Sequence, residues 1–367
     1  MSPEAAIGGA RALTPQGWTG PVELIVDGEG RIAELRPTTG PVPDRSLVPG
    51  FVDLQVNGHD DVDVAGAHGT DWDRLDDLLA AQGVTTWCPT LVTAPLDRYT
   101  VLLAEIAAAS ARVGDRPSIA GAHLEGPFLG GRAGAHPVEH VRPVDATWLA
   151  GLPEVVRLVT LGPEVVGAVE ATRALADRGV LVSLGHSAAT YEQAEAAAEA
   201  GARLVTHAFN ATGALHQRAP GLLGAALSDD RLAVSLIADL AHVHPALLRM
   251  AFRAKGADRV ALVTDAVAWR AGSVGEVEVR RGPDGVPRRP DGTLAGSALT
   301  MDQAVRNVVA AAGVEPTDAL VAAASTPAAL LGLDDRGALV PGRRADVVAL
   351  SPALAVTSTW VAGVRVH

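Results

Sequence analysis

The chain has 367 residues, of which 48% are hydrophobic and 20% charged, so it can form a large folded core or two domains. Its formal net charge is −12 and its basic residues form no long block, which argues against a nucleic-acid surface or an anionic membrane as partner. A single cysteine, Cys88, excludes an intramolecular disulfide and is best interpreted as buried strand filler. Because the first residues lack a signal-peptide pattern, we expect a cytoplasmic protein.

The two ends of the chain are predicted to be rich in β-strands. Residues 22–35 (VELIVDGEGRIAEL) alternate in polarity around an Asp27-Gly28 turn signal, and residues 337–367 have the same character. We therefore expect residues 1–48 together with residues 340–367 to form one small β-sandwich domain. Residues 49–339 are expected to form the catalytic domain.

The middle of the chain alternates between apolar strand-like runs and Ala-rich helical runs. Helices are predicted over residues 71–83, 97–112, 164–179 and 190–201, with Gly201 as the C-terminal stop of the last. This α/β alternation predicts a parallel sheet, and its length favours a (β/α)8 TIM-type barrel over a doubly wound open sheet. No GxGxxG follows the first strands and GxxxxGK[ST] is absent, so nucleotide-binding folds lose their main support. Residues 280–292 are predicted to form a β-hairpin insertion.

Polar side chains follow several of the apolar runs. The carboxyl ends of the strands of a (β/α)8 barrel share one rim, where active sites are built, so we expect these side chains to converge. The set consists of Asp53, Gln55, Asn57, His123, Glu125, His186, His207, Asn210, Asp239, His242, His244 and Asp265.

Part of this set has the chemistry of a metal site. Glu125, His186 and His207 offer one oxygen and two imidazoles, which suits one catalytic Zn²⁺, although Fe²⁺, Co²⁺ and Mn²⁺ can use the same ligands. Such a metal lowers the pKa of bound water, and Asp265 could take that water's proton. Taken singly, each residue has a structural alternative, for example a helix N-cap at Asp265. Four such coincidences at strand ends favour the catalytic interpretation.

The motifs GAHLEGPF, LGHSAAT, THAFNA, IADLAHVHP, LVTDA and LAGSALTMDQAVRN, in this order, resemble the N-acetylglucosamine-6-phosphate deacetylase family of the amidohydrolase superfamily. The resemblance extends from residue 49 to about residue 350. It implies a (β/α)8 barrel with a small β-sandwich, and hydrolysis of the acetamide of N-acetyl-D-glucosamine 6-phosphate. Glu125, His186 and His207 fall on the family's metal ligands, and Asp265 falls on its catalytic aspartate.

The resemblance implies further roles. His136 would polarise the acetamide carbonyl, which makes it a catalytic as well as a substrate-binding residue. Asn210, Ala211 and His242 would bind the substrate. Arg218 would reach the phosphate in the neighbouring subunit of a homodimer, because its planar guanidinium suits a phosphate.

The sequence also departs from the family pattern. Gln55 and Asn57 stand where many amidohydrolases carry the His-x-His of a second metal site, so we expect one metal ion per subunit. Thr212-Gly213 and the acidic stretch His59-Asp60-Asp61 are further departures. Two alternatives stay open: N-acetylgalactosamine 6-phosphate or another N-acyl amine as substrate, and an inactive barrel that binds a sugar phosphate.

Overall fold

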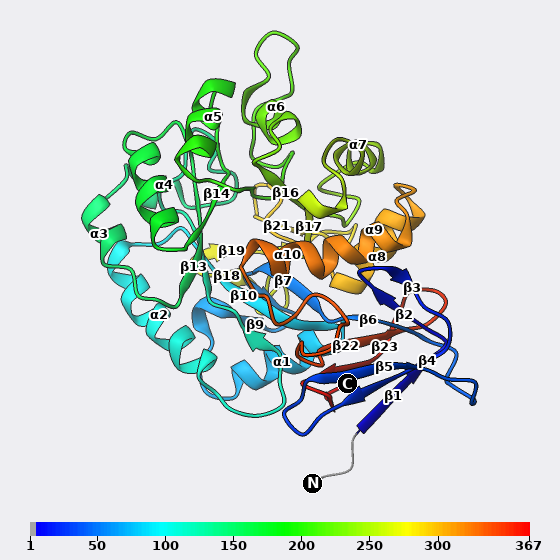
Figure 1. Ribbon diagram of the computed structural model, residues 1–367. Coiled ribbons are helices and arrows are strands. Elements are labelled where there is room, and N and C mark those ends of the chain that lie inside the picture. Colours follow the sequence, from blue (N-terminus) through cyan, green and yellow to red (C-terminus); the bar gives the residue numbers. More distant parts are fainter. Residues whose placement is uncertain (1–4) are drawn as a thin grey trace.

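The computed structural model describes residues 5–367, and its centre is a barrel of parallel strands surrounded by helices (Figure 1). Each barrel strand is hydrogen-bonded in parallel to the next along the chain. The barrel strands are β7 (Phe51–Val56), β10 (Val84–Val92), β12 (Ala122–Glu125), β13 (Val156–Leu161), β14 (Leu181–Leu184), β15 (Leu204–Val205), β16 (Ala233–Ile237) and β17 (Val260–Val263). The short β11 (Ser118–Ile119) pairs with β10 at the start of the β12 segment.

The first and last barrel strands meet at their carboxyl ends. The Asp265 amide donates to the Gln55 carbonyl at 3.0 Å, and the Asn57 amide donates to the Ala266 carbonyl at 2.9 Å. A parallel bridge joins Val56 to Ala266. These contacts bring β17 against β7, so the predicted (β/α)8 barrel is confirmed and the open doubly wound sheet is not formed.

The helices pack outside the barrel; those before β17 connect successive barrel strands, and the last three follow β17. They are α1 (Asp71–Ala80), α2 (Leu96–Ser110), α3 (Ala146–Ala150), α4 (Ala168–Asp177), α5 (Tyr191–Ala200), α6 (Gly221–Ser228), α7 (Pro245–Lys255), α8 (Met301–Ala310), α9 (Pro316–Ala323) and α10 (Ser325–Leu330). Single 3₁₀ turns lie at η1 (Val64–Gly66), η2 (Val138–His140) and η3 (Ala257–Arg259).

Local sequence explains where α5 and α4 begin and end. Thr190 and Gln193 form a reciprocal capping box at the start of α5, and Gly201 ends that helix with a left-handed φ of 118°. The helix predicted over residues 164–179 is wrong at its start, because α4 begins only at Ala168. Gly167 takes a φ of 84°, which a helix cannot continue through, so Glu164 lies in a turn.

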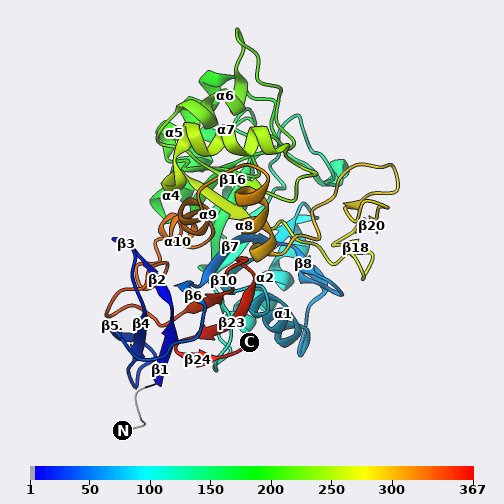
Figure 2. The same cartoon turned by 90° about the vertical axis from the view of Figure 1, so that its right-hand side faces the viewer.

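Strands from both ends of the chain share one sheet beside the barrel (Figures 1 and 2). Its order is β24-β23-β22-β6-β2-β3, formed by β24 (Val364–Arg365), β23 (Val356–Val361), β22 (Val347–Leu350), β6 (Ser46–Pro49), β2 (Arg11–Thr14) and β3 (Gly17–Trp18). A second sheet contains β1 (Ala5–Gly9), β4 (Val22–Val26) and β5 (Ile32–Pro37). Leu24, Leu47, Val347 and Trp360 belong to an apolar cluster of their own between these strands. The division at residues 48 and 340 stays a prediction, and its residues 1–4 lie outside the described part of the chain.

An excursion separates β17 from α8. It contains two antiparallel pairs, β18 (Ser273–Val274) with β19 (Val277–Glu278), and β20 (Arg280–Arg281) with β21 (Pro287–Arg288). The predicted hairpin over residues 280–292 is therefore confirmed, and Figure 2 shows that the excursion lies to one side of the barrel. A smaller hairpin, β8 (Gly58–His59) with β9 (Val62–Asp63), follows β7.

Two smaller expectations concern the core and the membrane. Cys88 lies fully buried in β10, as predicted for a filler residue. Within residues 5–367, none of the helices combines the length and the apolar character that crossing a bilayer requires.

Candidate active site

The predicted metal ligands and the predicted catalytic aspartate lie at the carboxyl ends of their strands. Glu125 is the last residue of β12, and His186, His207 and Asp265 each come two residues after the ends of β14, β15 and β17. His186, His207 and Asp265 have φ values of 49°, 32° and 48°, in the left-handed region. Each such residue costs about 1 to 3 kcal/mol, and strained backbone of this kind concentrates at functional sites. The rim therefore carries strain where the chemistry is expected.

The side chains of three of these residues converge on one carboxylate. His207 Nε2 lies 2.8 Å from Glu125 Oε1, and His186 Nε2 lies 3.1 Å from the same oxygen. The two imidazole Nε2 atoms are themselves 3.1 Å apart, and all three side chains are buried. Their convergence follows the expectation from the strand ends.

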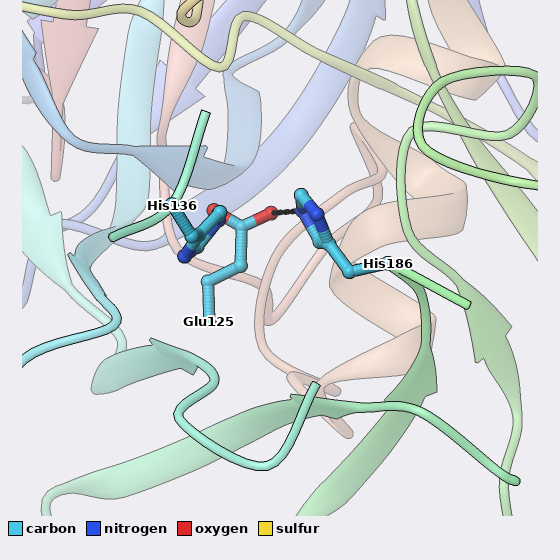
Figure 3. A group of neighbouring side chains, drawn as sticks. All are labelled: Glu125, His136 and His186. Carbon is cyan, nitrogen blue, oxygen red and sulfur yellow. Dashed lines mark hydrogen bonds and ion pairs between the residues drawn. The ribbon is translucent and has the colours of Figure 1, made fainter. Parts of the chain in front are cut away.

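A third histidine, His136, also approaches Glu125. Its Nε2 lies 3.6 Å from Glu125 Oε2, and Figure 3 shows the carboxylate between His136 and His186. Donor atoms of Glu125, His136 and His186 all lie within 4.8 Å of one another. A cation at Glu125 and His186 could therefore take either His207 or His136 as its third protein ligand on distance alone.

The hydrogen bonds on the far side of each ring distinguish His136 from His186. His186 Nδ1 faces the carbonyl oxygens of Arg132 and Ala133 at 3.2 and 3.1 Å. Carbonyls only accept, so this nitrogen carries the proton and Nε2 presents a lone pair. His136 Nδ1 instead accepts the Thr93 backbone N–H at 3.2 Å, so the neutral ring carries its proton on Nε2. His186 is thus arranged as a ligand and His136 as a donor, which favours His207 as the third ligand.

The ionisation of the cluster suits a cation. Burial alone would raise the pKa of Glu125, but the contacts with His136, His186 and His207 outweigh it and hold the pKa well below its usual range. Burial and the neighbouring His136 lower the pKa of His186, which keeps the imidazole neutral as a ligand must be. One carboxylate and two imidazoles are an N/O donor set that fits a divalent metal such as zinc.

Two neutral amides bind Asp265, and one of them, Gln55, also connects it to Glu125. The Gln55 Nε2 amide donates to Glu125 Oε1 at 2.9 Å and to Asp265 Oδ1 at 3.0 Å, and the Asn57 Nδ2 amide donates to Asp265 Oδ1 at 2.6 Å. Burial and the charge of Glu125 raise the pKa of Asp265. The amides therefore satisfy a buried carboxylate at the position where a second metal would need stronger ligands.

The predicted substrate-binding residues divide into two groups. Asn210, Ala211, His136 and His242 line a cavity of about 280 Å³ together with Glu125, His186, His207 and Asp265. His242 Nδ1 lies 2.7 Å from Asp239 Oδ2, which orients the ring. Arg218 does not line this cavity: it lies in the exposed segment between β15 and α6.

The structure assigns two of the strand-end histidines to structural tasks. His123 lies between Thr90 and Thr160, hydrogen-bonded on both ring nitrogens, and burial lowers its pKa to about 4. The His244 side chain caps α7 by accepting the Ala246 N–H. The structural alternatives therefore hold for these two residues.

Sequence reasoning missed one wall of the cavity. Residues 293–296 together with Val274 and Val277 of the excursion line it. Nearby, the Ser297 N–H donates to the Asp265 carbonyl and the Ser297 carbonyl accepts the Val267 N–H, and Gly296 has a φ of 60°. The only sequence signal was that the excursion directly follows the strand of Asp265.

The chain is similar to known proteins over most of its length. Residues 46–366 match the model of the amidohydrolase family. N-acetylgalactosamine-6-phosphate deacetylase from Escherichia coli O157:H7 is 40% identical, and the alignment covers 96% of this chain and 97% of that protein. N-acetylglucosamine-6-phosphate deacetylase from Bos taurus is 41% identical, with 86% and 82% covered. A mutant of N-acetyl-D-glucosamine-6-phosphate deacetylase from Mycobacterium smegmatis, in complex with N-acetyl-D-glucosamine-6-phosphate, has a TM-score of 0.91 at 32% identity and 99% coverage of both chains.

Proposed function

The chain belongs to the amidohydrolase family, and from this premise we propose that it hydrolyses the acetamide of N-acetyl-D-glucosamine 6-phosphate. The products would be D-glucosamine 6-phosphate and acetate. The resemblance seen in the motifs is confirmed by the long matches to deacetylases of this kind. The family match and those deacetylase relatives identify the chain as an enzyme of this family and argue against the inactive-barrel alternative.

One observation carries the proposal. Glu125 and the Nε2 atoms of His186 and His207 converge within 3.1 Å in one cavity, and the Asp265 carboxylate joins them through Gln55. These side chains supply three ligands and one base, which is the set that metal-assisted amide hydrolysis needs. Glu125, His186 and His207 would hold one divalent cation, with Zn²⁺ as our first choice.

Each residue has a separate task in the proposed reaction. The cation, when bound, polarises a carbonyl and acidifies a water molecule. His136 donates its Nε2 proton as a hydrogen bond to the acetamide oxygen, where negative charge develops. Asp265 accepts a proton from the attacking water and returns it to the departing amine, so the acetyl C–N bond breaks as the new C–O bond forms. The amides of Gln55 and Asn57 hold Asp265 in place.

The first test is acetate release from N-acetyl-D-glucosamine 6-phosphate by chelator-stripped protein, before and after zinc is added. Activity that returns only with zinc supports both the reaction and the metal dependence. Folded protein that stays inactive in both states contradicts the proposal. Adding iron, cobalt or manganese to the same stripped sample ranks the cations.

The galacto epimer is a second candidate substrate. A relative named N-acetylgalactosamine-6-phosphate deacetylase aligns over 96% of this chain at 40% identity, which is close to the identity of the gluco-named relatives. The two sugars differ only in the orientation of one hydroxyl group. Comparison of kcat/KM for the two sugar phosphates on the same preparation decides between them.

The proposal includes a homodimer and a cytoplasmic location. Leu215, 51% exposed, and Arg218 lie on the segment before α6 that projects from the barrel (Figure 1). Among residues 5–367 Arg218 forms no ion pair, and an exposed leucine three positions before it suits contact with a second subunit, where Arg218 would bind the substrate phosphate. Sedimentation together with Arg218→Ala kinetics tests this, because a monomer with unchanged KM contradicts it. A single buried cysteine fits a reducing compartment.

A further inference from the structure

A carboxylate outside the cavity connects the loops that present His136 and His186. We propose that Glu164 is a positioning residue for both histidines, an inference that rests on the function proposed above. Glu164 lies in the turn between β13 and α4 and does not line the cavity. It therefore acts through other residues.

Both oxygens of Glu164 accept hydrogen bonds from the two loops. Oε1 accepts the Gly131 N–H at 2.9 Å and the Ala188 N–H at 2.7 Å, and Oε2 accepts the Ser187 hydroxyl at 2.6 Å. Gly131 belongs to the loop after β12, which also carries His136, whereas Ser187 and Ala188 directly follow His186. Hydrogen bonds to a charged acceptor are about twice as strong as neutral ones, so the carboxylate joins the loops firmly.

This bridge lies next to the contacts that decide the protonation of His186. The carbonyls of Arg132 and Ala133, which accept the His186 Nδ1 proton, come directly after Gly131. The Gly130 N–H donates to the His186 carbonyl at 2.9 Å. A displacement of this loop would therefore move the acceptors of His186 and the backbone of His136 together. Partners of this kind orient a ligating histidine and fix its tautomer.

The surrounding backbone is shaped to admit the carboxylate. A Cβ atom at Gly130 would overlap the Glu164 carboxylate, and a Cβ atom at Gly162 would overlap the backbone nitrogen of Gly130. The left-handed Gly167 delays the start of α4, which leaves Glu164 in a turn rather than on the helix. Gly130 and Gly162 thus leave space for the carboxylate, and Gly167 keeps Glu164 outside the helix.

The bridge reaches a third loop through Ser187. The Ser187 N–H donates to the Ala211 carbonyl at 3.0 Å, and Ala211 lines the cavity. Glu164 thus connects the segments after β12, β14 and β15. A change at Glu164 is expected to affect catalytic geometry more than substrate affinity.

The test compares Glu164→Ala with Glu164→Gln. The glutamine oxygen can still accept both N–H groups, and its NH₂ can donate to the Ser187 hydroxyl, so the bridge persists without the charge. We expect Glu164→Ala to lower kcat and to weaken zinc affinity by about 10- to 100-fold each, with a smaller change in KM. Glu164→Gln should restore most of both. Glu170→Ala, at an exposed position on α4, is the matched control.

Zinc affinity is measured by chelator competition on stripped protein, which requires no knowledge of the substrate. If the wild type releases acetate from neither sugar phosphate, the proposed function fails, while the zinc comparison still tests Glu164. A folded Glu164→Ala protein with wild-type zinc affinity and kcat overturns the proposal. Ser187→Ala removes one of the three hydrogen bonds to Glu164 and also the acceptor of the Ala189 N–H. It should cause a smaller loss than Glu164→Ala, and the double variant should lose less than the sum of the two. Fully additive losses would contradict a shared bridge.

Discussion

The loops after β12 and β14 each bring a histidine to Glu125, yet they hold the two rings in opposite ways. The ring centroids of His136 and His186 lie 4.3 Å apart. His186 gives its far-side proton to two carbonyls, whereas His136 receives a backbone N–H. Identical side chains at one carboxylate are thereby divided into a lone-pair donor and a proton donor. The hydrogen-bond partner of Nδ1, rather than the distance from Nε2 to Glu125, decides the role of each histidine.

The largest effect should come from the loop after β14. His186→Ala removes a ligand, so we expect zinc binding to be lost and kcat/KM to fall by about a thousandfold or more, since the metal supplies several kcal/mol. Zinc content after dialysis and acetate release measure the two losses. A variant that keeps stoichiometric zinc would break the comparison, because His136 would then be able to replace His186.

Asp265→Asn should come next. The amide cannot take a proton, so we expect kcat to fall by about 10²- to 10⁴-fold with zinc binding retained. The asparagine oxygen can still accept from Gln55 and Asn57, which keeps the site folded. Zinc content and single-turnover rates are the measurements. Near-normal turnover would remove Asp265 from the proton pathway.

His136→Ala is predicted to separate catalysis from metal binding. Loss of one donor to the developing oxyanion should lower kcat by about 10²- to 10³-fold, while zinc affinity changes little. Chelator competition on this variant beside His186→Ala gives the contrast directly. Equal loss of zinc affinity in both variants would show that His136 is a ligand and that its assigned tautomer is wrong.

Thr93→Val tests which group of Thr93, the backbone N–H or the hydroxyl, orients the His136 ring through Nδ1. The Thr93 hydroxyl lies 2.9 Å from His136 Nδ1, but the Thr93 backbone N–H also donates to that atom and remains in the variant. We expect kcat to fall only about 2- to 10-fold, the value of one ordinary hydrogen bond. A loss as large as that of His136→Ala would mean that the hydroxyl, and not the N–H, orients the ring.

A substitution far from both loops provides the baseline. Leu24 is fully buried in the cluster formed by the terminal strands, so Leu24→Ala should lower the free energy of unfolding by about 2 to 5 kcal/mol. The kcat of the folded fraction should not change. Urea unfolding and active-site-normalised rates test this. A lowered kcat in folded protein would show that the terminal strands influence the rim.

The sequence predicted those site residues that lie at the carboxyl ends of strands. Glu125, His186, His207 and Asp265 were placed together because parallel strands share one rim. The different roles of His136 and His186 followed in the sequence only from the family resemblance. Residue types alone do not give them, since they depend on Thr93 and on the carbonyls of Arg132 and Ala133. Residue roles beyond this geometry stay predictions.

Glu164 is a residue whose local structure the sequence pattern predicted wrongly. Its neighbourhood has a helical pattern, and only the left-handed Gly167 diverts it into a turn. The cavity wall at residues 293–296 escaped prediction for a similar reason, because a long excursion folds back in a direction that its short-range pattern does not encode.

The contact between β7 and β17 has a consequence for how this protein becomes active. Asp265 meets Gln55 and Asn57 across the joint where the first and last barrel strands come together, and 210 positions of chain separate Gln55 from Asp265. A nascent or truncated chain that ends before β17 contains every proposed metal ligand but no general base. With Asp265 as the proposed base, turnover is expected only after synthesis and folding have reached β17.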